Sequence, residues 1–144
     1  MMMRILGIDF GDKTLGLAIS DLMGITAQPL EQYQIRGPGA DRSFFQYLIK
    51  QKQIGKIVIG LPLRMDGTEG TRVEKTRRFA DWLRSFIDLP VVFWDERLTT
   101  KQALHLLREQ SSGPQKKKQR KDKVAAAIIL AAYLESERDD PPTI

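Results

Sequence analysis

The sequence contains no cysteine and only one histidine, His105, among its 144 residues. Disulfide bonds, thiolate catalysis and cysteine-ligated zinc are therefore excluded, and so is a metal site built from several histidines. Any metal ion must be held by carboxylate oxygens, which suit Mg²⁺ or Mn²⁺. A chain without cysteine needs no oxidising environment for disulfide formation, so we expect a protein of the reducing cytoplasm.

Long apolar runs are also missing. The longest uncharged apolar run, Val124 to Leu134, is too short to span a bilayer, and the run at the N-terminus soon meets Asp9. We therefore expect neither membrane association nor a signal peptide. The length fits a single domain, which we place at residues 1–138, followed by a disordered tail at 139–144.

The formal net charge of +5 is confined to one short segment. Residues 116–123 hold six basic side chains and one acidic one, whereas the rest of the chain carries 17 basic and 17 acidic side chains. This pattern favours a local contact with a polyanion, although a solvated loop has the same composition. We expect the segment to contact phosphates and to be mobile without nucleic acid. Its basic residues are Lys116, Lys117, Lys118, Arg120, Lys121 and Lys123.

Two short apolar runs near the N-terminus predict a β-hairpin. Residues 4–10 and 14–20 are each long enough for a strand, and Gly11-Asp12-Lys13 joins them. Asp9 lies inside the first run, where an unpaired carboxylate is costly, so it should be paired or bind a metal ion. A turn-capping role before Gly11 is the alternative.

The rest of the chain alternates between strands and helices. The later strands are each reached through a helix and should run parallel to the first, which gives a mixed five-stranded sheet with helices on both faces. Pro29 places the third strand at an edge, and Trp82 and Trp94 are expected in the core. The predicted elements are a strand at 24–35, a helix at 41–53, strands at 56–60 and 91–94 around a helix at 71–86, a helix from Thr99 or Thr100, and a helix at 122–137.

Acidic residues follow the parallel strands. Asp9 ends the first strand, while Asp95 and Glu96 follow the fifth. The carboxyl ends of parallel strands share one edge of the sheet, and two strand spacings put these ends about 10 Å apart. Asp95 and Glu96 point to opposite faces, so only one can aim at Asp9, and the longer Glu96 is favoured.

Asp122 opens the last helix on the face that carries Ala126 and Ile129, so it should turn toward the same edge of the sheet. Simpler roles exist for each acid. Asp122 can act as a helix N-cap, and the Asp95-Glu96-Arg97 sequence can form a surface salt bridge.

Four ordered motifs resemble those of the YqgF family, also called RuvX, over roughly residues 4–135: GIDFGDKTLGLAISD, GLPLRMDGTEG, DERLTT and DKVAAAIIL. This family is a branch of the RNase H-like superfamily and is related to the RuvC-type Holliday junction resolvases. The resemblance implies an α/β fold whose five-stranded sheet has the order 3-2-1-4-5. It also implies a hydrolase of phosphodiester bonds, a nuclease that processes the 5′ end of precursor 16S rRNA during ribosome biogenesis.

The resemblance assigns roles to particular residues. It implies that Asp9, Glu96 and Asp122 hold two Mg²⁺ or Mn²⁺ ions, with Asp95 as a further catalytic candidate; two such ions activate water and stabilise the leaving oxygen. Lys13, Arg97 and the basic residues of segment 116–123 are expected to bind phosphates.

The sequence departs from the family pattern at two positions. The fourth strand ends in Gly60, where RNase H-like enzymes usually carry an acid, so the acidic pair after the fifth strand or Glu69 must supply that ligand. Lys13-Thr14 stands where family members often have Lys-Arg, which puts in doubt the role of an arginine there.

Three other interpretations compete with cleavage of structured RNA. A resolvase of four-way DNA junctions would use the same chemistry, and a non-catalytic RNA-binding factor of ribosome assembly would keep the fold. The sequence Gly7 to Gly11 also resembles the phosphate loop of actin and Hsp70, but those ATPases need a second, duplicated domain. A resolvase acts as a symmetric dimer. We expect a monomer, because the apolar stripes are used in packing helices on the sheet and no heptad run remains.

Overall fold

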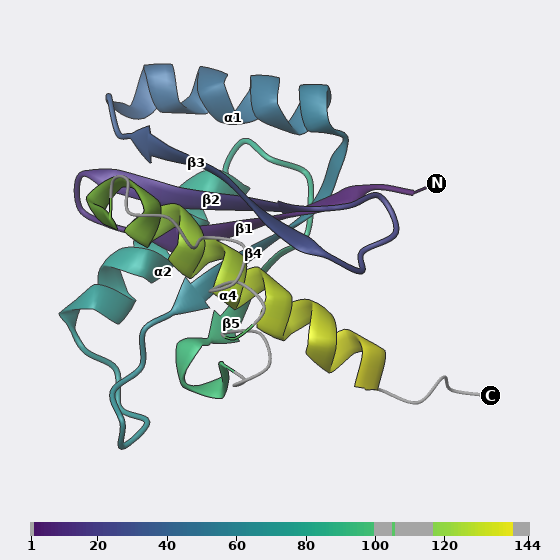
Figure 1. Cartoon of the computed structure of the whole chain (residues 1–144). Coiled ribbons are helices and arrows are strands. Elements are labelled where there is room, and N and C mark those ends of the chain that lie inside the picture. Colours follow the sequence, from purple (N-terminus) through teal and green to yellow (C-terminus); the bar gives the residue numbers. More distant parts are fainter. Residues whose placement is uncertain (1, 100–104, 106–116, 140–144) are drawn as a thin grey trace.

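A computed structural model of the protein describes residues 2–99, 105 and 117–139, with the backbone alone described at 117–122 and 139. Its five strands form one sheet of order β3-β2-β1-β4-β5 (Figure 1). The β1–β2 and β2–β3 pairs are antiparallel, and the β1–β4 and β4–β5 pairs are parallel. The predicted mixed sheet and its order are confirmed. The strands are β1 (Arg4–Phe10), β2 (Thr14–Ser20), β3 (Ala27–Gln34), β4 (Ile54–Leu61) and β5 (Val91–Asp95).

Helices cover both faces of the sheet, as predicted. On one face, α1 (Pro38–Lys52) and α2 (Thr71–Arg84) bury Phe45 and Leu83 against the strands. On the other face, α4 (Lys117–Asp139) lies diagonally across the sheet and buries Ala126 and Leu130 (Figure 1). A short 3₁₀ helix, η1 (Glu96–Leu98), follows β5 directly.

Successive side chains of β1 point alternately toward the α1 and α2 layer and toward α4. Leu6 and Ile8 belong to the core beneath α1 and α2, so Gly7 and Asp9 face α4. A Cβ atom on Gly7 would lie 2.9 Å from the Cβ of Leu130 and 3.2 Å from the carbonyl oxygen of Ala126. Gly7 therefore lets α4 pack directly on β1, and Asp9 follows on the same face.

The last helix begins earlier than the sequence predicted. We expected a polar loop up to Lys121 and a helix from Asp122, but α4 begins at Lys117. Lysine, arginine and glutamine are good helix formers, so charge alone does not end a helix. The basic residues 117–123 therefore lie on the first turns of α4; their mobility stays a prediction. Thr99 is extended after η1, and the rest of the helix predicted from Thr99 or Thr100 lies outside the described residues apart from His105. Lys116 and residues 140–144 also lie outside them, whereas Asp139, predicted as the start of the tail, ends α4.

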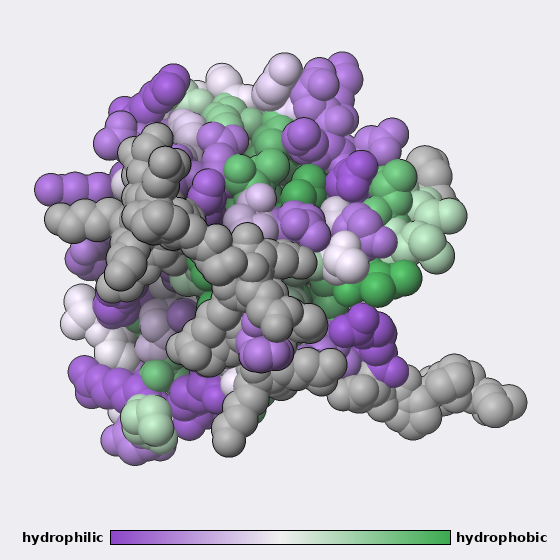
Figure 2. All heavy atoms as spheres, in the orientation of Figure 1, coloured by the Kyte–Doolittle hydropathy of each residue, from purple (hydrophilic) through white to green (hydrophobic). Residues whose placement is uncertain are grey.

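Exposed hydrophobic side chains gather where the N-terminus and the β2–β3 turn lie (Figure 2). Met2, Met3, Met23 and Ile25 are the large ones there. This end of the sheet lies opposite the carboxyl ends of the parallel strands. Within the described parts of the chain, no helix combines the length and apolarity needed to cross a bilayer.

Candidate active site

Asp9 lies at the carboxyl end of β1, half-buried on the face that α4 covers. It is paired with Gly16 of β2. On its other side, the parallel register pairs Ile8 with Ile59 of β4, so the next residue of β4, Gly60, lies beside Asp9. The centre of the sheet therefore presents a carboxylate next to a residue without a side chain.

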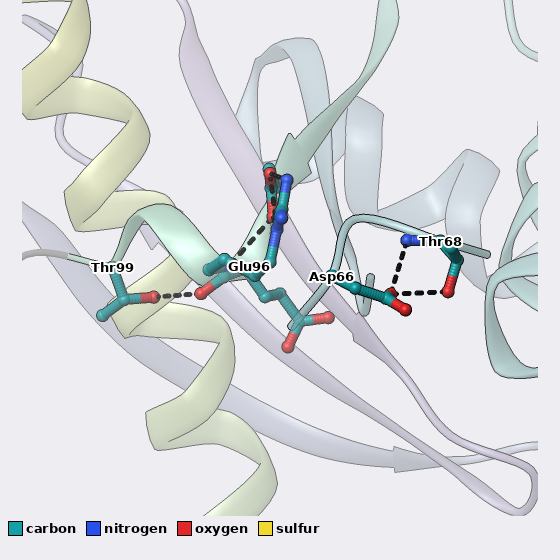
Figure 3. Close-up of polar contacts among 6 residues, drawn as sticks. Asp66, Thr68, Glu96 and Thr99 are labelled. Carbon is teal, nitrogen blue, oxygen red and sulfur yellow. Dashed lines mark hydrogen bonds and ion pairs between the residues drawn. The ribbon is translucent and has the colours of Figure 1, made fainter. Parts of the chain in front are cut away.

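The Glu96 side chain lies over Gly60. A Cβ atom on Gly60 would come within 3.1 Å of the Glu96 Cγ and within 2.5 Å of the Ile129 Cδ1 on α4. Glu96 follows β5, whose Trp94 is paired with Gly60, so its side chain turns back over the end of β4. Figure 3 shows the Glu96 carboxylate between α4 and the loop that carries Asp66. Because Gly60 has no side chain, the Glu96 side chain from beyond β5 can pack directly over the end of β4.

Burial raises the pKa of the half-buried Glu96 carboxyl above its ordinary value, and the negative charge of Asp95 adds to this rise. The positive charge of Arg72 acts in the opposite direction. A carboxylate that has lost water without full compensation gains from a nearby cation. The environment of Glu96 would therefore favour the binding of a cation to its carboxylate.

Asp95 has a different environment from its neighbour. Its carboxylate accepts hydrogen bonds from the backbone N–H of Arg97 at 2.9 Å and from the Arg97 guanidinium at 2.7 Å. The hydrogen bond from the Arg97 side chain is the main reason that the pKa of Asp95 lies below its ordinary value. Asp95 thus caps η1 and pairs with Arg97, which is the surface salt bridge considered from the sequence. Arg97, a predicted phosphate ligand, is engaged in the same pair.

The direction of α4 places Asp122 near the end of β1. Ala126 lies over Gly7, and further along α4 the Tyr133 hydroxyl accepts a hydrogen bond of 2.8 Å from Lys56. Lys56 is paired with Ile5, so α4 runs opposite to β1. Asp122 is one helical turn before Ala126, and its backbone therefore lies toward the Asp9 end of the strand. Its side chain lies outside the described residues.

Arg72 is a site residue that the sequence did not reveal. It lies in the first turn of α2, its guanidinium approaches the carbonyl oxygen of Phe10 at 3.5 Å, and its charge acts on Glu96. In the sequence, Arg72 is a basic residue on the exposed side of a predicted helix, a position that indicates no function. The signal that could have revealed it was its place directly after the LPLRMDGTEG loop, which follows β4 at the edge of the sheet where the acids gather.

The remaining predicted residues occupy separate places. Glu69 pairs with Arg77 at 2.6 Å, and Arg77 lies over the ring of Phe93 beneath α2, so Glu69 is directed away from Asp9. Lys13 is exposed in the β1–β2 turn. Lys123, on α4, lines a cavity with Thr14 at the start of β2.

The described acids leave the predicted metal site incomplete. Among residues whose side chains are described, no three acidic or histidine side chains form a group that could hold an ion. Asp122, the expected third ligand, is outside that set. The carboxylates of Asp9 and Glu96 offer only oxygen donors, the ligand type that a hard cation such as Mg²⁺ or Mn²⁺ prefers.

The model of a family described as "RuvX: Holliday junction resolvase" matches residues 3–136. The chain belongs to the RuvX family. Three of its relatives, each named "Putative pre-16S rRNA nuclease", span almost the same length. The chain is 50% identical over 139 residues to the protein of Bacillus thuringiensis, covering 94% of this chain and 100% of the relative. The protein of Bacillus cytotoxicus is 47% identical over 140 residues, which cover 94% of this chain and 100% of the relative. The protein of Koribacter versatilis is 41% identical over 141 residues, which cover 96% of this chain and 92% of the relative.

Solved structures with the same fold have little sequence in common with this RuvX chain. RuvC of Thermus thermophilus in complex with a Holliday junction substrate superposes with a TM-score of 0.59 at 15% identity, covering 93% of this chain and 96% of RuvC. A fowlpox virus resolvase bound to Holliday junction DNA gives a TM-score of 0.58 at 12% identity, covering 94% and 99%. These similarities establish the fold.

Proposed function

We propose that the protein is a metal-dependent endonuclease that processes the 5′ end of precursor 16S rRNA. The observation that carries the proposal is the position of the Glu96 side chain, which lies over Gly60, the residue of β4 beside Asp9. Two acids that converge on one edge of a parallel sheet are a suitable platform for phosphodiester hydrolysis. The names of the relatives, at up to 50% identity over nearly the whole chain, support precursor rRNA as the substrate.

In this proposal Asp9, Glu96 and Asp122 hold the metal ions, and the surrounding cations position the substrate. Bound Mg²⁺ or Mn²⁺ supplies an activated water and stabilises charge on the leaving oxygen. Arg72, beside Glu96, contacts a phosphate on the strand being cut, and the first turns of α4 with Lys13 hold phosphates further along. Asp95 keeps Arg97 and η1 in place, so that Glu96 is aimed at Asp9.

The direct test is cleavage of labelled precursor 16S rRNA with Mg²⁺, with Mn²⁺ or with EDTA. Asp9→Asn should abolish cleavage and leave the thermal unfolding temperature nearly unchanged, because the neutral amide has almost the same shape but no longer binds the ions. Glu69→Gln is the matched control, since it removes an acid at the same end of the molecule that is paired with Arg77. Full activity in Asp9→Asn would move the site elsewhere.

A four-way DNA junction is the second substrate in the same assay, because the structural neighbours named above bind such junctions. We expect a cytoplasmic monomer that makes single cuts in RNA. Sedimentation at micromolar concentration, with and without the junction, measures the oligomeric state. A stable dimer that makes paired, symmetric cuts in the junction would replace the rRNA proposal with the resolvase one.

A further inference from the structure

A hollow of about 400 Å³ opens on the opposite face of the sheet from Glu96, between α1 and α2 and beside the β1–β2 turn. Its wall is aromatic: Phe10, Phe79 and Trp82 are half-buried there, and Phe45 is fully buried behind them. The ring centroids of Phe10 and Phe79 are 4.9 Å apart, and those of Phe79 and Trp82 are 5.9 Å apart with the ring planes at 29°. The three rings form one continuous apolar surface.

Basic side chains line the hollow as well. Lys75 pairs with Asp12 at 3.2 Å and Arg78 pairs with Glu74 at 2.7 Å, and all four side chains are mostly exposed. Exposed ion pairs contribute little free energy, so a phosphate can replace the carboxylates at low cost. Both lysine and arginine are therefore available to a polyanion that enters the hollow.

The one buried acid of the hollow is already satisfied. The Asp41 carboxylate accepts hydrogen bonds from the Tyr33 hydroxyl at 2.6 Å and from the backbone N–H groups of Arg36 and Gly37. It therefore repels an incoming anion less than an unpaired carboxylate would. An aromatic wall beneath basic side chains is the arrangement with which proteins bind single-stranded nucleic acid.

A row of cations leads from the acidic site to this hollow. Arg72, Lys75 and Arg78 follow one another at three-residue spacing, which puts them on one side of α2. They span about 9 Å at a rise of 1.5 Å per residue. Arg72 lies beside Glu96 and Phe10, and Phe10 follows Asp9 directly. Stacked nucleotides of one strand advance about 3.4 Å each along the helix axis, and an extended strand advances further, so this row spans at most two or three nucleotides.

We propose that the hollow binds an unpaired base of a nucleic acid strand, within two or three nucleotides of the phosphate that lies at the Asp9 end of β1. The inference rests on the proposed function only in taking a nucleic acid strand as the ligand. In a duplex the base faces are covered by their stacked neighbours, so only an unpaired base can lay its face on Phe79 and Trp82. The hollow therefore selects a single-stranded segment next to the cleaved bond.

The test measures RNA binding without cleavage. Fluorescently labelled 12-nucleotide RNAs, one fully natural and the others each with one abasic position, are titrated with the full chain in EDTA while anisotropy is recorded. Trp82→Leu keeps an apolar side chain but removes the stacking surface, and should weaken binding of the natural RNA about tenfold. Phe86→Leu is the matched control: its ring packs on Trp82 at 4.8 Å but does not line the hollow, and binding should change less than twofold.

The abasic RNAs identify the contact. One abasic position should weaken binding to the parent protein about tenfold and cause no further loss in Trp82→Leu, because the same interaction has already been removed. Equal abasic losses in both proteins, no sensitive position in the parent, or equal binding by Trp82→Leu and Phe86→Leu would each overturn the proposal. A dimer that Trp82→Leu dissociates, with RNA binding unchanged, would make the hollow a self-association surface instead.

A second pair of variants guards against loss of folding. Arg78→Gln leaves the aromatic wall intact and should lower the salt dependence of RNA binding, whereas Lys52→Gln, at the far end of α1, should not. An unchanged salt slope in Arg78→Gln would contradict the proposed path. The abasic coupling should persist in Asp9→Asn. Coupling in a parent protein that cleaves no RNA would retain the base site and reject the nuclease, whereas cleavage without coupling would do the reverse.

Discussion

Gly60→Ala adds one methyl group at the point where the Ile129 and Glu96 side chains pack over a residue without a side chain. The new Cβ would lie 2.5 Å from the Cδ1 of Ile129 and 3.1 Å from the Cγ of Glu96. The first distance is far below van der Waals contact and the second is tight. The substitution therefore presses on α4 and on the Glu96 side chain together, and these two effects can be separated.

The effect on stability follows from overpacking. Extra methyl groups in a packed core cost about 1–3 kcal/mol, and loss of the conformational freedom of glycine in the unfolded chain offsets about 0.4–1 kcal/mol. The net destabilisation should be about 1–2 kcal/mol, because Ile129 is buried and α4 packs directly on β1 and holds it in place. For a chain of this length that lowers the unfolding temperature by about 3–8 °C.

A double variant separates the two contacts. Ile129→Val removes the Cδ1 atom and relieves the worst clash, although the shorter side chain costs about 0.5–1.5 kcal/mol by itself. Gly60→Ala/Ile129→Val should therefore be more stable than the sum of the single variants predicts. The contact with Glu96 remains, so Mn²⁺ binding and RNA cleavage should stay at least tenfold below the parent.

Thermal unfolding, Mn²⁺ titration followed by electron paramagnetic resonance, and cleavage rates measure the three quantities. Gly39→Ala is the control, since a Cβ there meets no atom within 4 Å and alanine suits the first turn of α1. Parental Mn²⁺ binding and cleavage in Gly60→Ala would refute the argument that Glu96 needs the space over Gly60. Full recovery of Mn²⁺ binding in the double variant would show that displacement of α4, and not of Glu96, caused the loss.

Three further predictions concern charge. Glu96→Gln should stabilise the metal-free protein at neutral pH. Because the pKa of Glu96 is raised, the folded state holds the Glu96 proton more tightly than the unfolded state does. The stability that Glu96 contributes to the parent protein is therefore lost as the pH rises from the ordinary value of 4.5 through the folded pKa. If Glu96→Gln still has a higher melting temperature than the parent at pH 3, this reasoning is wrong. Asp95→Asn should do the opposite. The lowered pKa of Asp95 gives stability that is present above the ordinary value of 3.8 and lost as the pH falls through the folded pKa, so an equal cost at pH 7 and pH 2 argues against the bond to Arg97. Replacement of three lysines by glutamine should flatten the salt dependence of RNA binding by about 0.7–0.9 for each phosphate that the protein no longer neutralises, and an unchanged slope would leave them as solvated surface: Lys116, Lys117 and Lys118.

The strands could be predicted because short apolar runs and glycine or proline breaks leave few alternatives, whereas their order was implied by the resemblance to the YqgF family. The stretch around Ile57 to Gly60 has no polar face, so it had to be a central strand buried on both sides. Helix ends were less certain, because lysine and arginine continue a helix as readily as they form a loop. That is why α4 begins five residues before the predicted Asp122.

The positions of the candidate acids along the backbone could be predicted, but the partners of the long side chains around them could not. The preference for Glu96 over Asp95 as a ligand rested on the alternation of an extended chain and on side-chain length, and it stays a prediction. The structure places Glu96 in η1, beyond the extended strand, with its side chain over Gly60. The Asp95–Arg97 pair was one of the alternatives considered from the sequence. The partners of Arg72 and Glu69, by contrast, depend on flexible side chains that meet groups on other parts of the fold. No local pattern in the sequence determines those contacts.

The period of two along β1 also explains how one strand end can serve both the acids and the hollow. Asp9 faces α4, and Phe10, the next residue, faces α1 and α2 and stacks near Phe79. The β1–β2 turn that follows is tight, because a Cβ on Gly11 would lie only 2.6 Å from the carbonyl oxygen of Thr14. A nucleic acid strand that crosses this end of the sheet meets a carboxylate on one side and an aromatic ring on the other. In the proposed function, these two adjacent residues would place the metal ligand and the base-binding hollow within a few nucleotides of each other.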